Sequence, residues 1–141
     1  MVILGKQLII CDRKSKFRKE YVHQIQQLIK DKSLNITLNL VTDQAKEVIS
    51  YLENRFLESI YIIDVNYLNP DDGIDLAKCI RMYDALGYIV FITSEEIDVS
   101  KVFRNKIQAM DYIKVTPEFE FRNRIQENLE CINSKSMRAF V

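Results

Sequence analysis

The sequence is poor in the residues that interrupt regular structure. Its 141 residues include only three glycines and two prolines, and no segment is low in complexity, so long disordered stretches are excluded. Net charge is also lacking, because 20 basic residues balance 20 acidic ones. A strongly cationic protein that binds nucleic acids through their phosphates is therefore not expected. The length predicts one ordinary globular domain.

Cysteine and histidine are scarce, and their positions exclude several kinds of site. Cys11, Cys79 and Cys131 are far apart and form no C-x-x-C motif, which favours buried thiols in a reducing compartment over disulfides. The single histidine, His23, has no evident partner for a catalytic triad and is expected to be solvated. No uncharged run is long enough to cross a bilayer and no signal peptide is apparent, so we expect a cytoplasmic protein.

Short apolar segments alternate with longer segments of helical period, which is typical of a parallel α/β sheet. The second strand alternates between apolar and polar residues, which predicts a strand that is covered on one face or lies at a sheet edge. The third is continuously apolar and predicts a central strand buried on both faces. The five expected strands are residues 8–11, 35–41, 60–64, 88–92 and 110–114.

A helix is expected after each strand, because apolar side chains recur there at helical spacing. We expect Asp43 to cap the second helix and Gly87 to end the third. Thr116 and Pro117 are typical of the start of the last helix. Residues 133–141 lose the helical period, which indicates a tail or the start of a linker.

Polar side chains stand where the expected strands end. Asp12 and Arg13 follow the first strand, Asp64 ends the third, Thr93 follows the fourth and Lys114 ends the fifth. Ligands of an open parallel sheet bind at this edge, near the point where the strand order reverses. The set suits phosphoryl chemistry. A small ligand-binding or enzymatic domain is least favoured, because the chain has neither a glycine-rich phosphate loop nor a Cys/His cluster for zinc.

These residues resemble the receiver domain of bacterial response regulators, over roughly residues 7–132. The resemblance rests on Asp64 at a strand end, Gly73 in the following loop, Thr93 and Tyr112, in matching order and spacing. It is most specific to the LytTR-type regulators of peptide quorum sensing, the Agr and Com group, which share a lengthened loop after the acceptor aspartate. It implies a CheY-like (flavodoxin-like), doubly wound parallel sheet of five strands in the order 2-1-3-4-5, with five helices.

The resemblance implies a signalling domain rather than an enzyme. A sensor histidine kinase would phosphorylate Asp64, with Mg²⁺ held by Asp12, Asp64 and the backbone carbonyl of Asn66. Thr93 would hydrogen-bond the phosphoryl group, and Tyr112 would be the aromatic switch that controls homodimer formation. Such a protein would bind DNA only through a further domain, so we expect a receiver at residues 1–132 and a tail or linker at residues 133–141.

Two positions depart from the family pattern. Arg13 stands where the family has a second acid, and Val115 stands where it has an invariant lysine, which leaves Lys114 one residue early. Because successive strand side chains face opposite sides, Lys114 could replace that lysine only through a bulge or a frayed strand end. We expect Arg13 to supply part of the missing charge by pairing with Asp64 or Asp12. The departures keep a second hypothesis open, an atypical pseudo-receiver that acts as a phosphate-independent interaction module.

Apolar residues around the last helix offer a candidate surface for self-association. Phe119 and Phe121 lie near the start of that helix, and Phe103 and Ile107 precede it. Packing in the core explains such residues equally well. Both alternatives stay open from the sequence.

Overall fold

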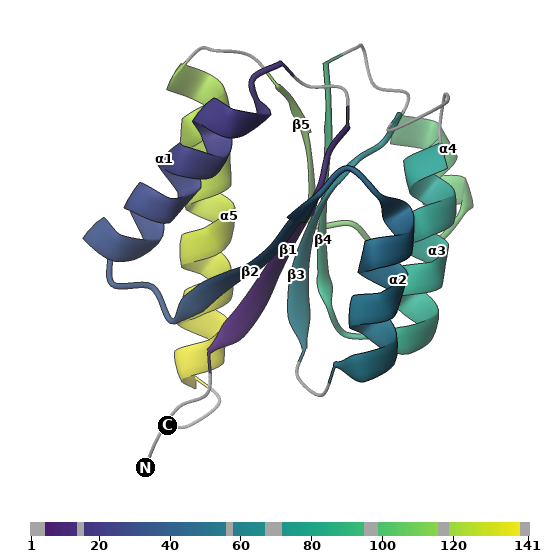
Figure 1. Ribbon diagram of the computed structural model, residues 1–141, viewed down its shortest axis with the longest axis horizontal. Helices are drawn as coiled ribbons and strands as arrows, with labels where there is room; N and C mark the ends of the chain where they lie inside the picture. Colours follow the sequence, from purple (N-terminus) through teal and green to yellow (C-terminus); the bar gives the residue numbers. More distant parts are fainter. Residues whose placement is uncertain are drawn as a thin grey trace.

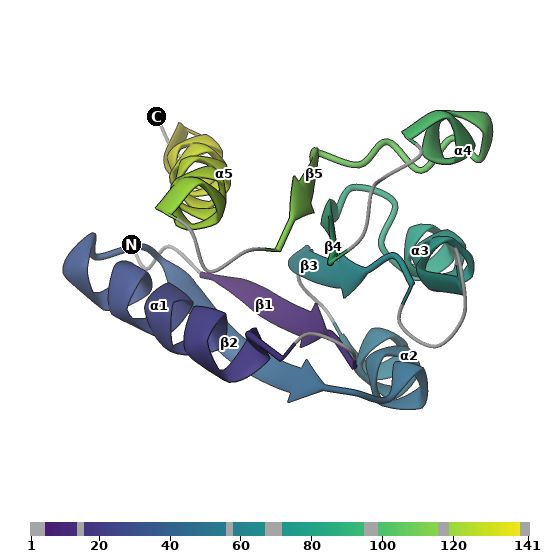
Figure 2. The same ribbon diagram turned by 90° about the horizontal axis from the view of Figure 1, so that it is seen from above.

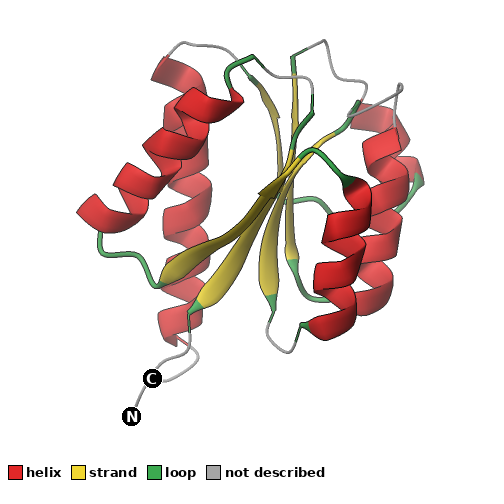
Figure 3. Ribbon diagram, viewed as in Figure 1, coloured by secondary structure: helices red, strands yellow, loops and turns green. Residues whose placement is uncertain are grey.

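The computed structural model describes residues 5–13, 16–55, 58–66, 72–94, 99–115 and 119–138, without the side chains of residues 99, 119 and 136–138. Within these ranges, strands and helices alternate along the chain (Figures 1 and 3). The strands are β1 (Lys6–Cys11), β2 (Ile36–Thr42), β3 (Ser59–Asp64), β4 (Tyr88–Thr93) and β5 (Asp111–Lys114). The helices are α1 (Arg18–Asp31), α2 (Ala45–Asn54), α3 (Asp72–Tyr83), α4 (Val99–Arg104) and α5 (Phe119–Arg138).

The strands form one parallel sheet in the order β2-β1-β3-β4-β5, which confirms the predicted topology. Figure 2 shows α1 and α5 on one face of the sheet and α2, α3 and α4 on the other. Strand β2 lies at an edge and alternates between buried and exposed residues, whereas every residue of the central β3 is buried. The two apolar patterns in the sequence therefore predicted the two strand environments correctly.

Each face of the sheet has its own hydrophobic core. Leu8, Ile10, Ile60 and Ile62 of the strands pack toward α1 and α5. The alternate residues Ile9, Cys11, Tyr61 and Ile63 pack toward α2, α3 and α4. Among the described helices, none is long and apolar enough to span a membrane.

The predicted helix boundaries at Asp43 and Gly87 are wrong. The residue before α2 is Gln44, in an extended conformation and without a capping bond from its side chain, while the Thr42 hydroxyl accepts a hydrogen bond from the Gln44 amide at 2.9 Å. Helix α3 already ends at Tyr83. Gly87 does not adopt a left-handed conformation; instead it lies so close to Asp84 that a Cβ atom would be 2.6 Å from the carboxylate.

The last helix is longer than predicted, because α5 continues through residues 133–138, which the sequence pattern assigned to a tail. The expected helix start at Thr116 and Pro117 lies outside the described residues. The single histidine, His23, is exposed as expected.

Two of the three thiols that were predicted to be buried are not. Only Cys11 is a buried thiol, since Cys79 is half-buried and Cys131 is exposed. Two members of the candidate association surface, Phe121 and Ile107, lie in the core.

Candidate functional site

The carboxyl ends of β1 and β3 bring two acidic side chains to one edge of the sheet. Cys11 of β1 pairs in register with Ile63 of β3, and the next residues are Asp12 and Asp64. Both carboxylates are almost fully enclosed, with exposed fractions of 0% and 4%. Buried carboxylates of this kind, at the ends of central strands, are the expected position of a functional site in an open parallel sheet.

The Cys11 thiol is buried at this edge, within reach of the charges of four aspartates. Burial, followed by the charges of Asp12, Asp64, Asp43 and Asp72, raises the pKa of Cys11 to about 12. The thiol is therefore protonated and unreactive. The contributions of Asp43 and Asp72 were not predicted, because Asp43 was expected to cap a helix and Asp72 had no expected role.

Asp64 is connected to Thr93 through Asn66. The backbone amide of Asn66 donates a hydrogen bond of 3.0 Å to Oδ1 of Asp64, and its side-chain amide donates one of 3.3 Å to Oγ1 of Thr93. Thr93 is buried at the end of β4. The structure thus brings together the predicted acceptor and the predicted threonine, and gives the Asn66 side chain a role that the sequence did not suggest.

Gly73 supports the turn that follows Asp64. Its amide donates a 2.8 Å hydrogen bond to the carbonyl oxygen of Val65. A Cβ atom on residue 73 would lie 2.7 Å from the Cα atom of Val65 and would also collide with the carbonyl oxygen of Asp64. Because these are backbone atoms, they cannot rotate away, and only glycine allows α3 to approach the candidate acceptor so closely.

Asp12 is held by a tyrosine. The hydroxyl of Tyr21 donates a 2.5 Å hydrogen bond to Oδ2 of Asp12, and the Arg18 guanidinium donates to the Asp12 carbonyl oxygen at 2.5 Å. Burial, and then the Asp12 charge, raise the pKa of Tyr21 far above its usual value. Tyr21 lies on the buried side of α1, and helical periodicity indicates only such burial and does not identify a hydrogen-bond partner.

Neither the ion pair expected of Arg13 nor the bulge that would re-aim Lys114 is found among the described residues. Arg13 is exposed, and among the described ion pairs none joins it to Asp12 or Asp64, so the predicted pairing is not supported. Strand β5 pairs regularly with β4 up to Thr93 and Lys114, without the bulge that would re-aim Lys114. Lys114 is exposed beside Thr93, while the Val115 side chain is buried.

Tyr112 lies on the face of the sheet that α3 and α4 cover. Its ring stacks on that of Phe91, with the ring centres 5.5 Å apart and the planes inclined by 19°. It is half-buried, and burial raises the pKa of its hydroxyl to about 12. An aromatic side chain that is packed on one side and solvated on the other can change rotamer without opening the core.

The oxygen donors at this edge fit a magnesium ion that retains several water ligands. Among the described residues, no three Asp, Glu, His or Cys side chains converge on a metal position. Asp12 and Asp64 nevertheless provide two buried carboxylates on adjacent strands. Mg²⁺ is commonly bound by one or two carboxylates together with water and phosphate oxygens.

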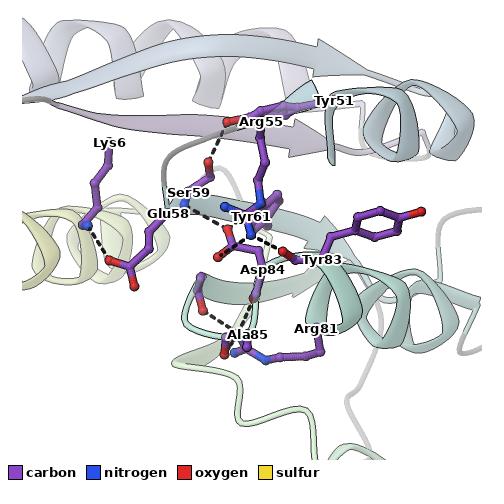
Figure 4. A network of polar contacts seen from close by, with 11 residues as sticks. Lys6, Tyr51, Arg55, Glu58, Ser59, Tyr61, Arg81, Tyr83, Asp84 and Ala85 are labelled. Atoms are coloured by element: carbon purple, nitrogen blue, oxygen red, sulfur yellow. Dashed lines mark hydrogen bonds and ion pairs between the residues drawn. The ribbon is translucent and has the colours of Figure 1, made fainter. Parts of the chain in front are cut away.

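A second polar cluster, at the amino end of the sheet, is centred on Asp84 (Figure 4). Its carboxylate accepts hydrogen bonds from the Ser59 amide at 3.0 Å and the Tyr61 hydroxyl at 2.8 Å, and pairs with Arg55 at 3.4 Å. The guanidinium of Arg81 donates to backbone carbonyls of the loops before β4 and β5. These contacts enclose the acid completely and indicate a structural role.

No protein-family model matches the chain. Over 128 residues it is 30% identical to the accessory gene regulator protein A of Staphylococcus aureus and 27% identical to that of Staphylococcus epidermidis. These alignments include 91% of this chain but 54% of each relative, so the chain spans about half the length of the curated relatives it matches.

Solved structures with the same fold include the response regulatory domain of protein mrkE from Klebsiella pneumoniae. Its TM-score is 0.71 at 22% identity, over 94% of this chain and 98% of that one. A CheY-like receiver domain protein from Methanospirillum hungatei JF-1 has a TM-score of 0.69 at 15% identity, over 96% and 98% of the two chains.

The sheet and its helices match solved receiver domains, and the sequence is similar to the accessory gene regulators. The chain is a receiver domain of the response-regulator family, with sequence relatives among the Agr regulators.

Proposed function

We propose that this receiver accepts a phosphoryl group on Asp64 from a sensor histidine kinase, as part of a LytTR-type two-component regulator in the cytoplasm. The observation that carries the proposal is the hydrogen-bonded connection from the buried Asp64 carboxylate through Asn66 to the Thr93 hydroxyl. It links a candidate acceptor, through one intervening residue, to a group that can sense whether the acceptor is modified.

In the proposed transfer, an oxygen atom of Asp64 attacks the phosphorus atom of a phosphohistidine. The P–N bond breaks, its electron pair stays on the imidazole nitrogen, and the new P–O bond gives an acyl phosphate on Asp64. Such transfers depend mainly on positioning and on neutralising charge over three phosphoryl oxygens. The chain therefore assists its own phosphorylation and acts as a signalling domain rather than as an enzyme with a separate substrate.

Positive charge at this edge would come from Mg²⁺ and from Lys114. Asp12, Asp64 and the backbone carbonyl of Asn66 would hold the ion, which when bound neutralises negative charge on phosphoryl oxygens. Lys114 lies in register beside Thr93 with its side chain exposed, so it is the candidate for the second cation.

Thr93 and Tyr112 would carry the signal away from Asp64. The Thr93 hydroxyl, which accepts a hydrogen bond from Asn66, would donate one to a phosphoryl oxygen and move toward it. Tyr112 of β5 packs against Phe91, which lies on β4 together with Thr93. Tyr112 would then change rotamer. The expected output is a homodimer formed through α4, β5 and α5, where the Phe103 side chain is 77% exposed. DNA would be contacted by another domain.

The alternative is a pseudo-receiver that associates with partners without phosphorylation. Burial of Val115, at the position of the family's lysine, and the exposure of Arg13 in place of an acid favour it. Under this alternative Asp64 would keep its position in the fold but accept no phosphoryl group.

The decisive experiment is intact-protein mass spectrometry after incubation with acetyl phosphate, with and without Mg²⁺. We expect a Mg²⁺-dependent phosphoryl adduct on the wild-type protein and none on Asp64→Ala. Asp43→Ala is the matched control, since Asp43 is an exposed carboxylate of the same edge, and it should retain the adduct. A folded wild-type protein that gives no adduct, or an adduct that persists in Asp64→Ala, would reject the proposal.

A further inference from the structure

The bond between Tyr21 and Asp12 lies inside the core. Asp12 is fully buried, and Tyr21 is buried between α1 and α5, where its ring packs edge-on against Phe121 at 5.5 Å between ring centres. The Asp12 amide also donates to the Thr42 carbonyl oxygen at 3.0 Å. Neither partner can leave the bond by a simple rotation into solvent, so the hydroxyl of Tyr21 is a fixed feature of the carboxyl edge.

A hydrogen bond to a buried carboxylate has two consequences for a metal ion. The donated proton uses one of the lone pairs of the carboxylate and draws negative charge from it, which leaves less charge for a cation at the remaining lone pairs. It also offsets part of the cost of burying the Asp12 charge. The phenol thus replaces part of what a cation would supply to Asp12.

We propose that Tyr21 is a positioning residue that competes with Mg²⁺ for the Asp12 carboxylate and so weakens metal binding at this receiver's acidic edge. The inference rests on the proposed function, because it assigns the regulation of the same site. It also adds a local reason for low metal affinity to the replacement of an acid by Arg13.

The amino end of the sheet provides a matched control. Tyr61 is also a buried tyrosine whose hydroxyl donates to a buried aspartate, at 2.8 Å to Oδ2 of Asp84. Its aspartate is, however, paired with Arg55, so no cation is expected there. Tyr21→Phe and Tyr61→Phe each remove one hydroxyl from one buried acid, and both are expected to reduce stability. Only the first is expected to alter metal binding.

The test measures Mg²⁺ affinity from the rise in unfolding temperature during a MgCl₂ titration, against NaCl of equal ionic strength. Removing a hydrogen bond to a charged group changes an equilibrium by about tenfold or more, so Tyr21→Phe should bind Mg²⁺ about tenfold more tightly than wild type. Tyr61→Phe should match wild type. Equal affinities in wild type and Tyr21→Phe, an equal gain in Tyr61→Phe, or no Mg²⁺ response in any variant would overturn the inference.

A second measurement uses the wild-type protein and does not depend on the folding of a variant. A buried tyrosine hydroxyl proton exchanges slowly enough with water to give its own NMR signal. Saturating Mg²⁺ should shift or remove the hydroxyl signal of Tyr21 and leave that of Tyr61 unchanged, whereas an unmoved Tyr21 signal contradicts the competition.

These outcomes are independent of the phosphorylation assay. Tighter Mg²⁺ binding by Tyr21→Phe without a phosphoryl adduct would retain the inference and reject the proposed function. An adduct with unchanged Mg²⁺ affinity would do the reverse.

Discussion

The two ends of the sheet differ in the charged groups that surround their buried acids. The three ion pairs that join described residues all include a residue that begins a strand or precedes one: Lys6–Glu58, Arg55–Asp84 and Arg124–Asp111. At the carboxyl end, by contrast, the charges of Asp12, Asp64, Asp43 and Asp72 act together on one thiol, and Arg13 and Lys114 are exposed.

The amino end of the sheet therefore contributes to stability, whereas the carboxyl end provides the candidate functional site. At the amino end, hydrogen bonds and a guanidinium offset the desolvation of Asp84, so that acid fastens β3 and the loop before β4 (Figure 4). At the carboxyl end, the fold concentrates negative charge that a cation or a phosphoryl transfer can use. Sites of this kind commonly cost stability, because their arrangement serves chemistry rather than packing.

The largest expected effect comes from neutralising the amino-end acid. Asp84→Asn removes the charge opposite Arg55, and its amide group would face donors at Ser59 or Tyr61. Breaking a buried, hydrogen-bonded ion pair typically costs about 3–5 kcal/mol, so we expect the free energy of unfolding to fall by about 3 kcal/mol. Urea denaturation followed by circular dichroism measures the change.

The control for that variant is a more exposed ion pair at the same end of the sheet. Lys6 and Glu58 are 3.4 Å apart, and the Glu58 side chain is 42% exposed. Because such pairs contribute about 1 kcal/mol or less, Glu58→Ala should change stability little. A loss in Asp84→Asn as small as that in Glu58→Ala would contradict the role given to the Asp84 cluster.

The matching Asp-to-Asn substitution at the carboxyl end of the sheet should not lower the free energy of unfolding. Asp64→Asn keeps an oxygen that can accept the hydrogen bond from the Asn66 amide, and it lowers the negative charge that acts on Cys11 at this edge. We expect the variant to be as stable as wild type or up to about 1 kcal/mol more stable, and to lose the phosphoryl adduct. Urea denaturation in low salt measures the stability; a loss of more than 1 kcal/mol would show that the Asp64 charge itself holds the fold together.

Most of the architecture could be predicted from the sequence, because apolar period is a direct consequence of which faces are buried. The alternation in β2 and the continuous apolar run in β3 identified an edge strand and a central strand. Boundaries were less predictable. A Cβ atom at residue 87 would meet the Asp84 carboxylate and the Tyr61 ring. Helical period does not reveal such a close approach, so Gly87 was mistaken for the end of a helix.

The candidate site was predictable where strand ends determine position and was missed where tertiary contacts decide. Asp12, Asp64 and Thr93 meet because parallel strands end at one edge. Tyr21 and the Asn66 side chain were missed as site residues, because their partners lie on other elements. A tyrosine on an otherwise apolar stripe was the available signal, since a buried hydroxyl requires a hydrogen-bond partner.

The smallest expected effect is a pH dependence at Asp111, the first residue of β5. Although burial alone would raise it, the pKa of Asp111 is lowered by hydrogen bonds from Arg124, Asn128 and the Tyr112 amide. The folded state therefore binds this proton more weakly than the unfolded state, where an aspartate has a pKa of about 3.9. The stabilisation is complete above that value and is lost as the pH falls through the lower pKa of the folded state.

Asp111→Asn should accordingly flatten the loss of stability between about pH 4 and the onset of acid unfolding. Asp75→Asn is the matched control, because Asp75 is an exposed aspartate of α3, and its profile should follow that of wild type. Urea midpoints measured across this pH range test both variants. Since Asp111 is half-buried and its partner Arg124 is partly solvated, screening by water limits the effect. Identical acid profiles for Asp111→Asn and wild type would mean that, of the amino-end ion pairs, Arg124–Asp111 contributes to geometry alone.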